Sequence, residues 1–258
     1  MRGIQRIAVL GGGVIGASWS ALFLAAGRSV VVFDPAPDVE RSVRTYIDKA
    51  WPALEELGLT DRATPDAIVF SASAADAVDG ADFVQENVPE RLELKHATFA
   101  EIEPVLPDAA IVSSSTSGLT LEALQKGWTN PGRLVQGHPF NPPHLIPLVE
   151  LTANSATDDD VLDRTEALYA DVGKVTIRIK KGLPGHVANR LQAAVWREAV
   201  HMAVEGVASV EDITHMNHIP VAKVDGGVSG CVCRSEMHEL NGLPVEVELH
   251  AVVVGDDR

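Results

Sequence analysis

The feature that most limits how this chain can fold is a glycine-rich turn between an apolar run and a helix-like segment. Residues 4–10 form the apolar run, and Gly11, Gly13 and Gly16 follow it at the spacing G-x-G-x-x-G. In this pattern the first glycine makes a tight turn, the second lets the backbone approach a ligand, and the third lets the helix pack closely on the strand. The next segment, 14–26, is predicted to be a helix that Gly27 ends.

This turn is also typical of dinucleotide binding, because the free N–H groups at a helix N-terminus attract a pyrophosphate. A β-branched run at 30–33 predicts the next strand, and Asp34 follows it directly. A carboxylate there would bind ribose hydroxyls and repel a 2′-phosphate, which favours NAD. For Asp34 alone, a helix cap or a turn residue is the alternative. The predicted NAD-binding residues are Gly11, Gly13, Val14, Ile15, Gly16 and Asp34.

Short strand-like runs alternate with helix patterns along most of the chain. The further strands are expected at 68–70, 82–85, 110–112, 134–137 and 175–179, and the clearest further helices at 38–57 and 91–102. This alternation predicts an α/β fold with a Rossmann-type, doubly wound, mostly parallel sheet that has helices on both faces.

The pattern changes after residue 182. We expect an NAD-binding Rossmann-type domain at 1–182 and the start of a helical C-terminal domain at 183–213, with a helix from His186 to about Glu205. Residues 214–258 have a residue pattern that is more strand-like than helical, with a strand-like alternation at 245–249, and form an atypical tail.

Composition excludes several classes of partner. A formal net charge of −15 would repel a polyanion, so no nucleic-acid binding is expected. No apolar run approaches the length that a bilayer requires, and no membrane interaction is expected. Cys231 and Cys233, separated by one residue, fit neither a disulfide framework nor the usual structural zinc spacings. We expect a cytoplasmic protein that binds a small-molecule substrate and has no metal site.

Several further motifs occur in order along the chain. They are Gln-Glu-Asn-Val-Pro-Glu-Arg-Leu-Glu-Leu-Lys at 85–95, Ser-Ser-Ser-Thr-Ser-Gly-Leu at 113–119, Gly-His-Pro-Phe-Asn-Pro-Pro at 137–143, Pro-Leu-Val-Glu-Leu at 147–151 and Pro-Gly-His-Val-Ala-Asn-Arg-Leu at 184–191. Together they resemble the 3-hydroxyacyl-CoA dehydrogenase family over residues 3–213. The segment 85–95 looks closest to the branch that contains carnitine 3-dehydrogenase and L-gulonate 3-dehydrogenase, the latter also found as lambda-crystallin.

The resemblance implies NAD-dependent oxidation of the C3 hydroxyl of an L-3-hydroxyacyl-CoA or of a free 3-hydroxy acid of the carnitine or gulonate type. It places Glu86 and Lys95 near the nicotinamide, although a surface helix also readily carries such charges. Residues 196–199 are shared in character with the carnitine enzymes, whereas 189–192 look more like the gulonate enzymes. The substrate therefore stays open between these classes.

The chemistry of the same motifs supports a catalytic reading. A histidine suits a base that takes the proton of an alcohol, because the unperturbed imidazole titrates near physiological pH, and His138 is the candidate. The resemblance assigns Glu150 to holding the His138 tautomer, and matches Ser117 and Asn189 to groups that position the substrate oxygen. We expect Ser117 and His138 just past the carboxyl ends of two strands. Taken singly, these residues could be a structural histidine, a solvated acid, a polar turn and a helix cap.

Two departures from the family pattern bear on function. His186 stands where many members have an aromatic or apolar residue. After residue 213 the chain lacks the helical pattern that closes the active site and forms much of the dimer interface in the family. A truncation, a frameshift or a fused segment would each explain this. A homodimer therefore stays an open expectation, and a non-catalytic NAD-binding protein, crystallin-like or truncated, is the alternative function.

Overall fold

The computed structural model describes residues 3–58, 64–182, 185–216, 232–235 and 249–252. The chain divides into two compact units, Met1–His186 and Val187–Arg258. Most of the predicted strand at 245–249, Cys231, and most of the atypical tail lie outside the described residues. The predicted domain boundaries therefore stay predictions.

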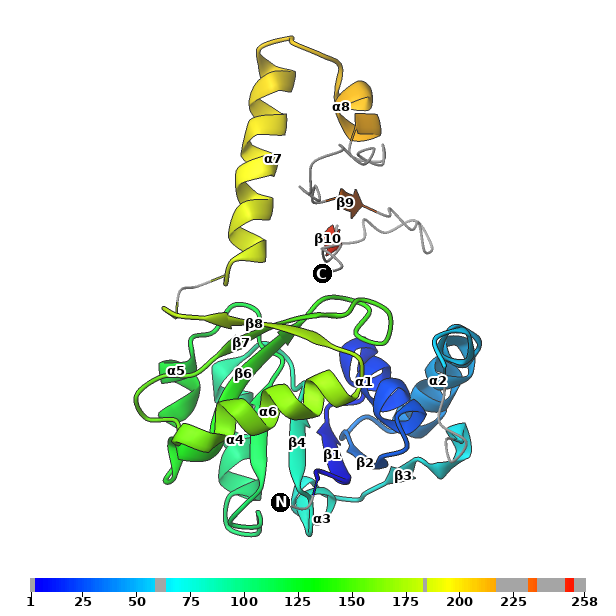
Figure 1. Cartoon of the computed structure of the whole chain (residues 1–258), viewed down its shortest axis with the longest axis vertical. Helices are drawn as coiled ribbons and strands as arrows, with labels where there is room; N and C mark the ends of the chain where they lie inside the picture. Colours follow the sequence, from blue (N-terminus) through cyan, green and yellow to red (C-terminus); the bar gives the residue numbers. More distant parts are fainter. Residues whose placement is uncertain (1–2, 59–63, 183–184, 217–231, 236–248, 253–258) are drawn as a thin grey trace. The chain divides into compact units, whose positions relative to one another are not determined.

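The first unit is built on an eight-stranded sheet with the order β3-β2-β1-β4-β5-β6-β7-β8 (Figure 1). Neighbouring strands are parallel except β6 and β7, which are antiparallel. This confirms the predicted doubly wound, mostly parallel sheet. The strands are β1 Arg6–Leu10, β2 Ser29–Phe33, β3 Val69–Phe70, β4 Phe83–Glu86, β5 Ile111–Ser114, β6 Leu134–Pro139, β7 Leu148–Thr152 and β8 Val175–Ile179.

Apolar residues alternate between the two faces of the sheet, so each face has its own core. In β1, Ile7 and Val9 pack into one buried cluster, whereas Ala8 and Leu10 pack into the other. The first cluster includes residues of α1 Val14–Ala25, α2 Val39–Glu56 and α6 Asp159–Asp171. The second includes residues of α3 Ala74–Val78, α4 Leu92–Ile102 and α5 Leu121–Gln125. The described part of the unit also contains the 3₁₀ turns η1 Pro65–Ala67 and η2 Pro131–Arg133.

The sequence analysis predicts no strand at β7, whose central residue is a glutamate. In the structure all five of its residues are buried, Glu150 included. The helices at 14–26, 38–57 and 91–102 are confirmed to within one residue at each end.

The second unit contains α7 Ala188–Val204, α8 Val210–Met216 and an antiparallel pair, β9 Val232–Ser235 and β10 Leu249–Val252. The predicted helix at the start of this region is present, but it begins later than expected because His186 has a φ of +46°, outside the helical range. Within the described part of the chain, no helix has the length and apolar content needed to cross a membrane.

Candidate active site

The glycine turn after β1 has a geometry that larger residues would disrupt. Gly11 has a φ of +90°, and a Cβ there would lie 2.5 Å from the Asn87 carbonyl oxygen. A Cβ on Gly16 would lie 1.8 Å from the carbonyl oxygen of Gly11 itself, so the helix closes directly onto the turn. At Gly13, by contrast, no atom lies within 4 Å of the position of an added Cβ. The turn is therefore closed on the protein side and open at Gly13.

The N-terminus of α1 suits an anion. It has neither a side-chain cap nor an acidic residue in its first turn, and Val14 in that turn is 58% exposed. Beyond β2, the Asp34 carboxylate accepts hydrogen bonds from the backbone N–H groups of Gly12 and Ala36, both at 2.8 Å. The predicted turn role of Asp34 is thus present, and a carboxylate with four lone-pair sites retains capacity for ribose hydroxyls. These residues fit an NAD molecule.

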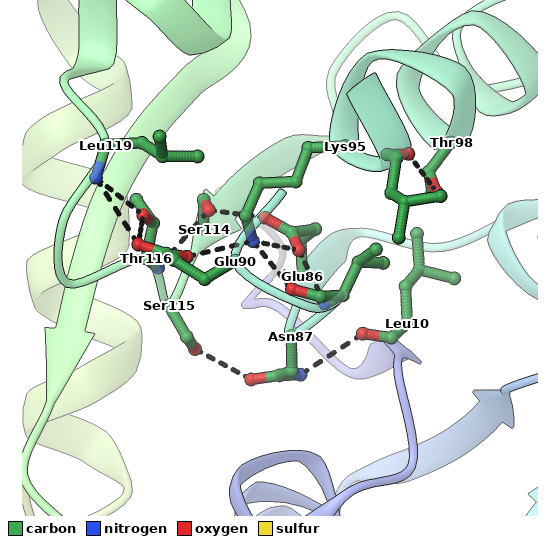
Figure 2. Close-up of polar contacts among 12 residues, drawn as sticks. Leu10, Glu86, Asn87, Glu90, Lys95, Thr98, Ser114, Ser115, Thr116 and Leu119 are labelled. Atoms are coloured by element: carbon green, nitrogen blue, oxygen red, sulfur yellow. Dashed lines mark hydrogen bonds and ion pairs between the residues drawn. The ribbon is translucent and has the colours of Figure 1, made fainter. Parts of the chain in front are cut away.

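A buried ion pair lies at the carboxyl end of β4 (Figure 2). Lys95 of α4 is 1% exposed and Glu86 is 0% exposed, with 2.7 Å between Lys95 Nζ and Glu86 Oε1. Lys95 also donates to the Val88 carbonyl oxygen at 2.8 Å, and Ser114 donates to the other oxygen of Glu86. The surface-helix alternative for this pair is therefore wrong, since both charges are buried and satisfied. Their placement near the nicotinamide stays a prediction.

Sequence reasoning missed Glu90. Its Oε1 accepts hydrogen bonds from three consecutive N–H groups, those of Ser117, Gly118 and Leu119, at 3.1, 2.7 and 3.3 Å, and from the Thr116 hydroxyl. Partial burial raises the pKa of Glu90, but the Thr116 hydroxyl, the loop N–H groups and Lys95 outweigh it and lower that pKa below its usual value. A second acid four residues after Glu86 was the available signal, but only the folded loop gives it a partner.

Ser117 lies in this loop, three residues past the end of β5, as expected. Its backbone is held by Glu90, and the preceding residues continue the network through Ser115, whose hydroxyl donates to Asn87 Oδ1 at 2.7 Å (Figure 2). The loop that carries Ser117 is thus fixed to the loop after β4.

His138 and Glu150 face each other across the antiparallel pair β6–β7. The distance between His138 Nδ1 and Glu150 Oε2 is 2.8 Å, and the side chains are 10% and 0% exposed. Because a carboxylate accepts, Nδ1 carries the proton and Nε2 presents a lone pair. The expectation that His138 follows its strand is wrong in detail: pairing with β7 extends β6 to Pro139, so His138 lies within the strand, near its end.

The residues at the carboxyl ends of β1, β4, β5 and β6 meet at one edge of the sheet. Leu10 is aligned with Glu86, Glu86 with Ser114, and Ser114 with Gln136, two residues before His138. Since these four strands are parallel, the glycine turn, the buried ion pair, the Ser117 loop and the histidine lie at the carboxyl ends, where such sheets bind ligands.

Asn189 stands apart from these residues in the chain. It lies in the first turn of α7, in the second compact unit, and its role stays a prediction. No cluster of three or more His, Cys, Asp or Glu side chains capable of holding a metal ion occurs among the residues that the structure describes.

Comparison with protein families matches residues 6–182 to the 3-hydroxyacyl-CoA dehydrogenase NAD-binding domain and 185–218 to the C-terminal domain of that family. This chain belongs to the 3-hydroxyacyl-CoA dehydrogenase family. Its first unit therefore contains that family's NAD-binding domain.

Curated relatives include an L-carnitine dehydrogenase of Nocardiopsis dassonvillei, 46% identical over 210 residues that make up 81% of this chain and 64% of that protein. An L-carnitine dehydrogenase of Pseudomonas putida is 43% identical over 81% of this chain and 65% of its own length. This family member thus spans slightly less than two thirds of these relatives.

Solved structures give the same fold. The 5-formyl-3-hydroxy-2-methylpyridine 4-carboxylic acid 5-dehydrogenase, an NAD+-dependent dismutase, superposes with a TM-score of 0.79 at 33% identity, covering 84% of this chain and 71% of its own. The (S)-3-hydroxybutyryl-CoA dehydrogenase of Ralstonia eutropha superposes with a TM-score of 0.74 at 28% identity, covering 81% of this chain and 75% of its own.

Proposed function

We propose that this chain is an NAD-dependent dehydrogenase that oxidises the C3 hydroxyl of an L-3-hydroxy acid, with L-carnitine as the first candidate substrate. The observation that carries the proposal is the buried His138–Glu150 pair at the carboxyl edge of an NAD-binding sheet. The choice of L-carnitine follows from the names of relatives that are 41–46% identical to this chain.

Because His138 Nδ1 donates to the Glu150 carboxylate, Nε2 is the nitrogen that can act as a base for the hydroxyl proton. When bound, NAD+ supplies the acceptor for the hydride that leaves C3. As His138 becomes an imidazolium, the Glu150 carboxylate stabilises the new charge, and the low exposure of both side chains strengthens that interaction. Ser117 and Asn189 are proposed to donate hydrogen bonds to the substrate oxygen.

Glu86, Glu90 and Lys95 are proposed to shape the nicotinamide side of the site. The Glu86–Lys95 pair is buried, so its charges are already offset before any ligand arrives. Glu90 fixes the Ser117 loop through three N–H groups. Together they hold the NAD side and the substrate side of the site in one network.

The test is the growth of NADH absorbance with purified protein, NAD and L-carnitine, L-gulonate or L-3-hydroxybutyryl-CoA. We expect turnover on L-carnitine, and a loss of kcat of about 10²- to 10⁴-fold in His138→Gln, the usual contribution of a general base. Unchanged turnover in His138→Gln would show that another group is the base. Silence on all three substrates, with NAD binding confirmed by calorimetry, would instead support a non-catalytic NAD-binding protein.

A homodimer and a cytoplasmic location remain proposals for this chain, as does the absence of a metal site. Light scattering of the purified protein, coupled to size exclusion, tests the first of these.

A further inference from the structure

His186 has a left-handed backbone conformation, which is unfavourable unless contacts of the residue stabilise it. Its φ of +46° is the one positive φ of a non-glycine residue in the part of the chain that the structure describes, and Gly185 before it has a φ of +80°. For an L-residue other than glycine this region is unfavourable, so it persists where side-chain contacts determine it. The side chain provides them: His186 is only 4% exposed.

The imidazole of His186 makes two contacts with the candidate active site. Its ring stacks on the His138 ring, with centroids 4.9 Å apart and planes 17° apart. Its Nε2 lies 3.3 Å from the Thr116 carbonyl oxygen. Since a carbonyl only accepts, this nitrogen carries the proton and the tautomer is set. One side chain therefore touches both the proposed base and the loop before Ser117.

The Thr116 end of this bridge is itself firmly held. The Thr116 hydroxyl and the next three backbone N–H groups all donate to Glu90. The hydrogen bond from His186 therefore joins this side chain to a loop that Glu90 already holds in place.

The surroundings of His186, and burial above all, favour its neutral form. Burial and then the neighbouring His138 lower its pKa, while Glu150, Glu90 and the Thr116 hydrogen bond act in the opposite direction more weakly. A neutral aromatic face can accept a positive charge on the stacked ring, whereas two imidazolium ions at this distance would repel each other. The stack is thus compatible with His138 in either protonation state.

We propose that His186 is a positioning residue, which holds the His138 ring in the orientation that presents Nε2 and ties it to the Ser117 loop. The inference rests on the proposed function for the role of His138 as base, but the stack and the hydrogen bond stand on geometry alone. His186 itself takes no proton from the substrate.

The experiment records ¹⁵N NMR signals of the His138 ring in the full chain. Two variants separate the contacts: His186→Asn removes the ring but tolerates the left-handed backbone, and His186→Phe keeps an aromatic plane without the bond to Thr116. We expect sharp His138 signals with the Nδ1–H pattern that Glu150 enforces in the wild type and in His186→Phe. In His186→Asn we expect the His138 signals to shift and broaden, because the stacked ring no longer holds His138 in one orientation. With His186→Phe, the amide signals of Ser117 and Gly118 should shift.

The matched control is His96→Phe. His96 also bonds a backbone carbonyl through Nε2, at 2.8 Å from the Ala123 oxygen, and this bond joins α4 to α5 away from His138. His138 signals should be unchanged in this variant.

In turnover assays we expect His186→Asn to lose about 10- to 100-fold in kcat, the usual effect of a displaced catalytic group, with the KM for NAD within about twofold. His186→Phe should recover most of that loss. Unchanged His138 signals in His186→Asn would overturn the positioning role even if activity fell. An inactive wild type with the expected NMR changes would instead reject the proposed function and leave the positioning role intact.

Discussion

Glu150 is a carboxylate with no exposed surface, and such a group is costly to bury unless a partner satisfies it. Its partner is His138, directly opposite on the neighbouring strand. The pair is stabilised by one short contact of 2.8 Å that also sets the tautomer of the histidine. The same contact therefore makes the strand β7 possible and prepares a base.

At the residue scale, we expect Glu150→Gln to lower kcat by about 10²- to 10⁴-fold, because an amide neither stabilises an imidazolium nor enforces the Nδ1–H tautomer. The NAD dissociation constant from calorimetry should change by less than about threefold, since Glu150 lies opposite His138 and not at the glycine turn. The control is Glu103→Gln. In the wild type the Glu103 carboxylate accepts hydrogen bonds from the backbone N–H groups of Thr129 and Asn130, away from the site. Equal kcat values in the two variants would contradict the role of Glu150.

At the scale of the elements, Gly16 and Gly13 in the turn between β1 and α1 meet different requirements. Gly16 is a packing requirement, because a Cβ would overlap the Gly11 carbonyl oxygen at 1.8 Å. Gly13 is not, because its surroundings are open and its φ of −65° suits any residue. If Gly13 is retained for the pyrophosphate, stability and NAD affinity should respond differently to the two substitutions.

We expect Gly13→Ala to change the free energy of unfolding by no more than about 1 kcal/mol, the difference between these residues at a helix N-cap. Its NAD affinity, measured by calorimetry, should fall at least about tenfold because the methyl group occupies the approach to the helix N-terminus. Gly16→Ala should instead destabilise the fold in urea by about 1–3 kcal/mol or more, as overpacking does. A Gly13→Ala protein with wild-type NAD affinity would contradict this assignment.

At the scale of the whole molecule, the loop that follows His138 is fastened to the NAD-binding helix. Ser18 of α1 donates to His144 Nδ1 at 2.8 Å and accepts from the His144 backbone N–H at 2.9 Å. Lys174 donates to the Pro143 and Ile146 carbonyl oxygens, the latter at 2.8 Å. Burial lowers the pKa of Lys174 to about 7. The pKa of His144 is lowered to about 4, first by burial and then by the positive charge of Lys174.

The lowered pKa of His144 predicts that the fold loses stability at acidic pH. His144 has an ordinary pKa of 6.5 and a folded pKa of about 4, so the unfolded chain binds more protons between these values. Its contribution to stability is complete above pH 6.5 and is lost as the pH falls towards 4, by roughly 3 kcal/mol. In thermal unfolding, the stability of His144→Asn should fall less steeply with decreasing pH than that of the wild type. Asparagine keeps an acceptor for Ser18 and does not titrate. Parallel curves for the two proteins over pH 4–6.5 would refute this origin.

Local patterns were sufficient for much of this molecule. The run into Gly11 and Gly16, the helices at 14–26 and 38–57, and the strand–helix alternation depend on neighbours in sequence, and the structure confirms them. Buried parallel strands are apolar on both faces, which makes them visible as short continuous runs. The expected strand positions also put Ser117 and His138 at the carboxyl ends of two strands, and the family resemblance alone pairs Glu150 with His138.

Only the tertiary structure decided the rest, because each of these features joins residues that are far apart in the chain. The strand β7 is hidden in the sequence by Glu150, whose burial depends on a histidine twelve residues away. Lys95 and Glu86 look like surface charges until α4 folds over the end of β4. Glu90 gains its partners from a loop 26 to 29 residues later, and His186 meets Thr116 at a separation of 70 residues. Sequence patterns encode local conformation and burial, whereas the pairing of polar side chains is set by the packing that brings the strand ends together.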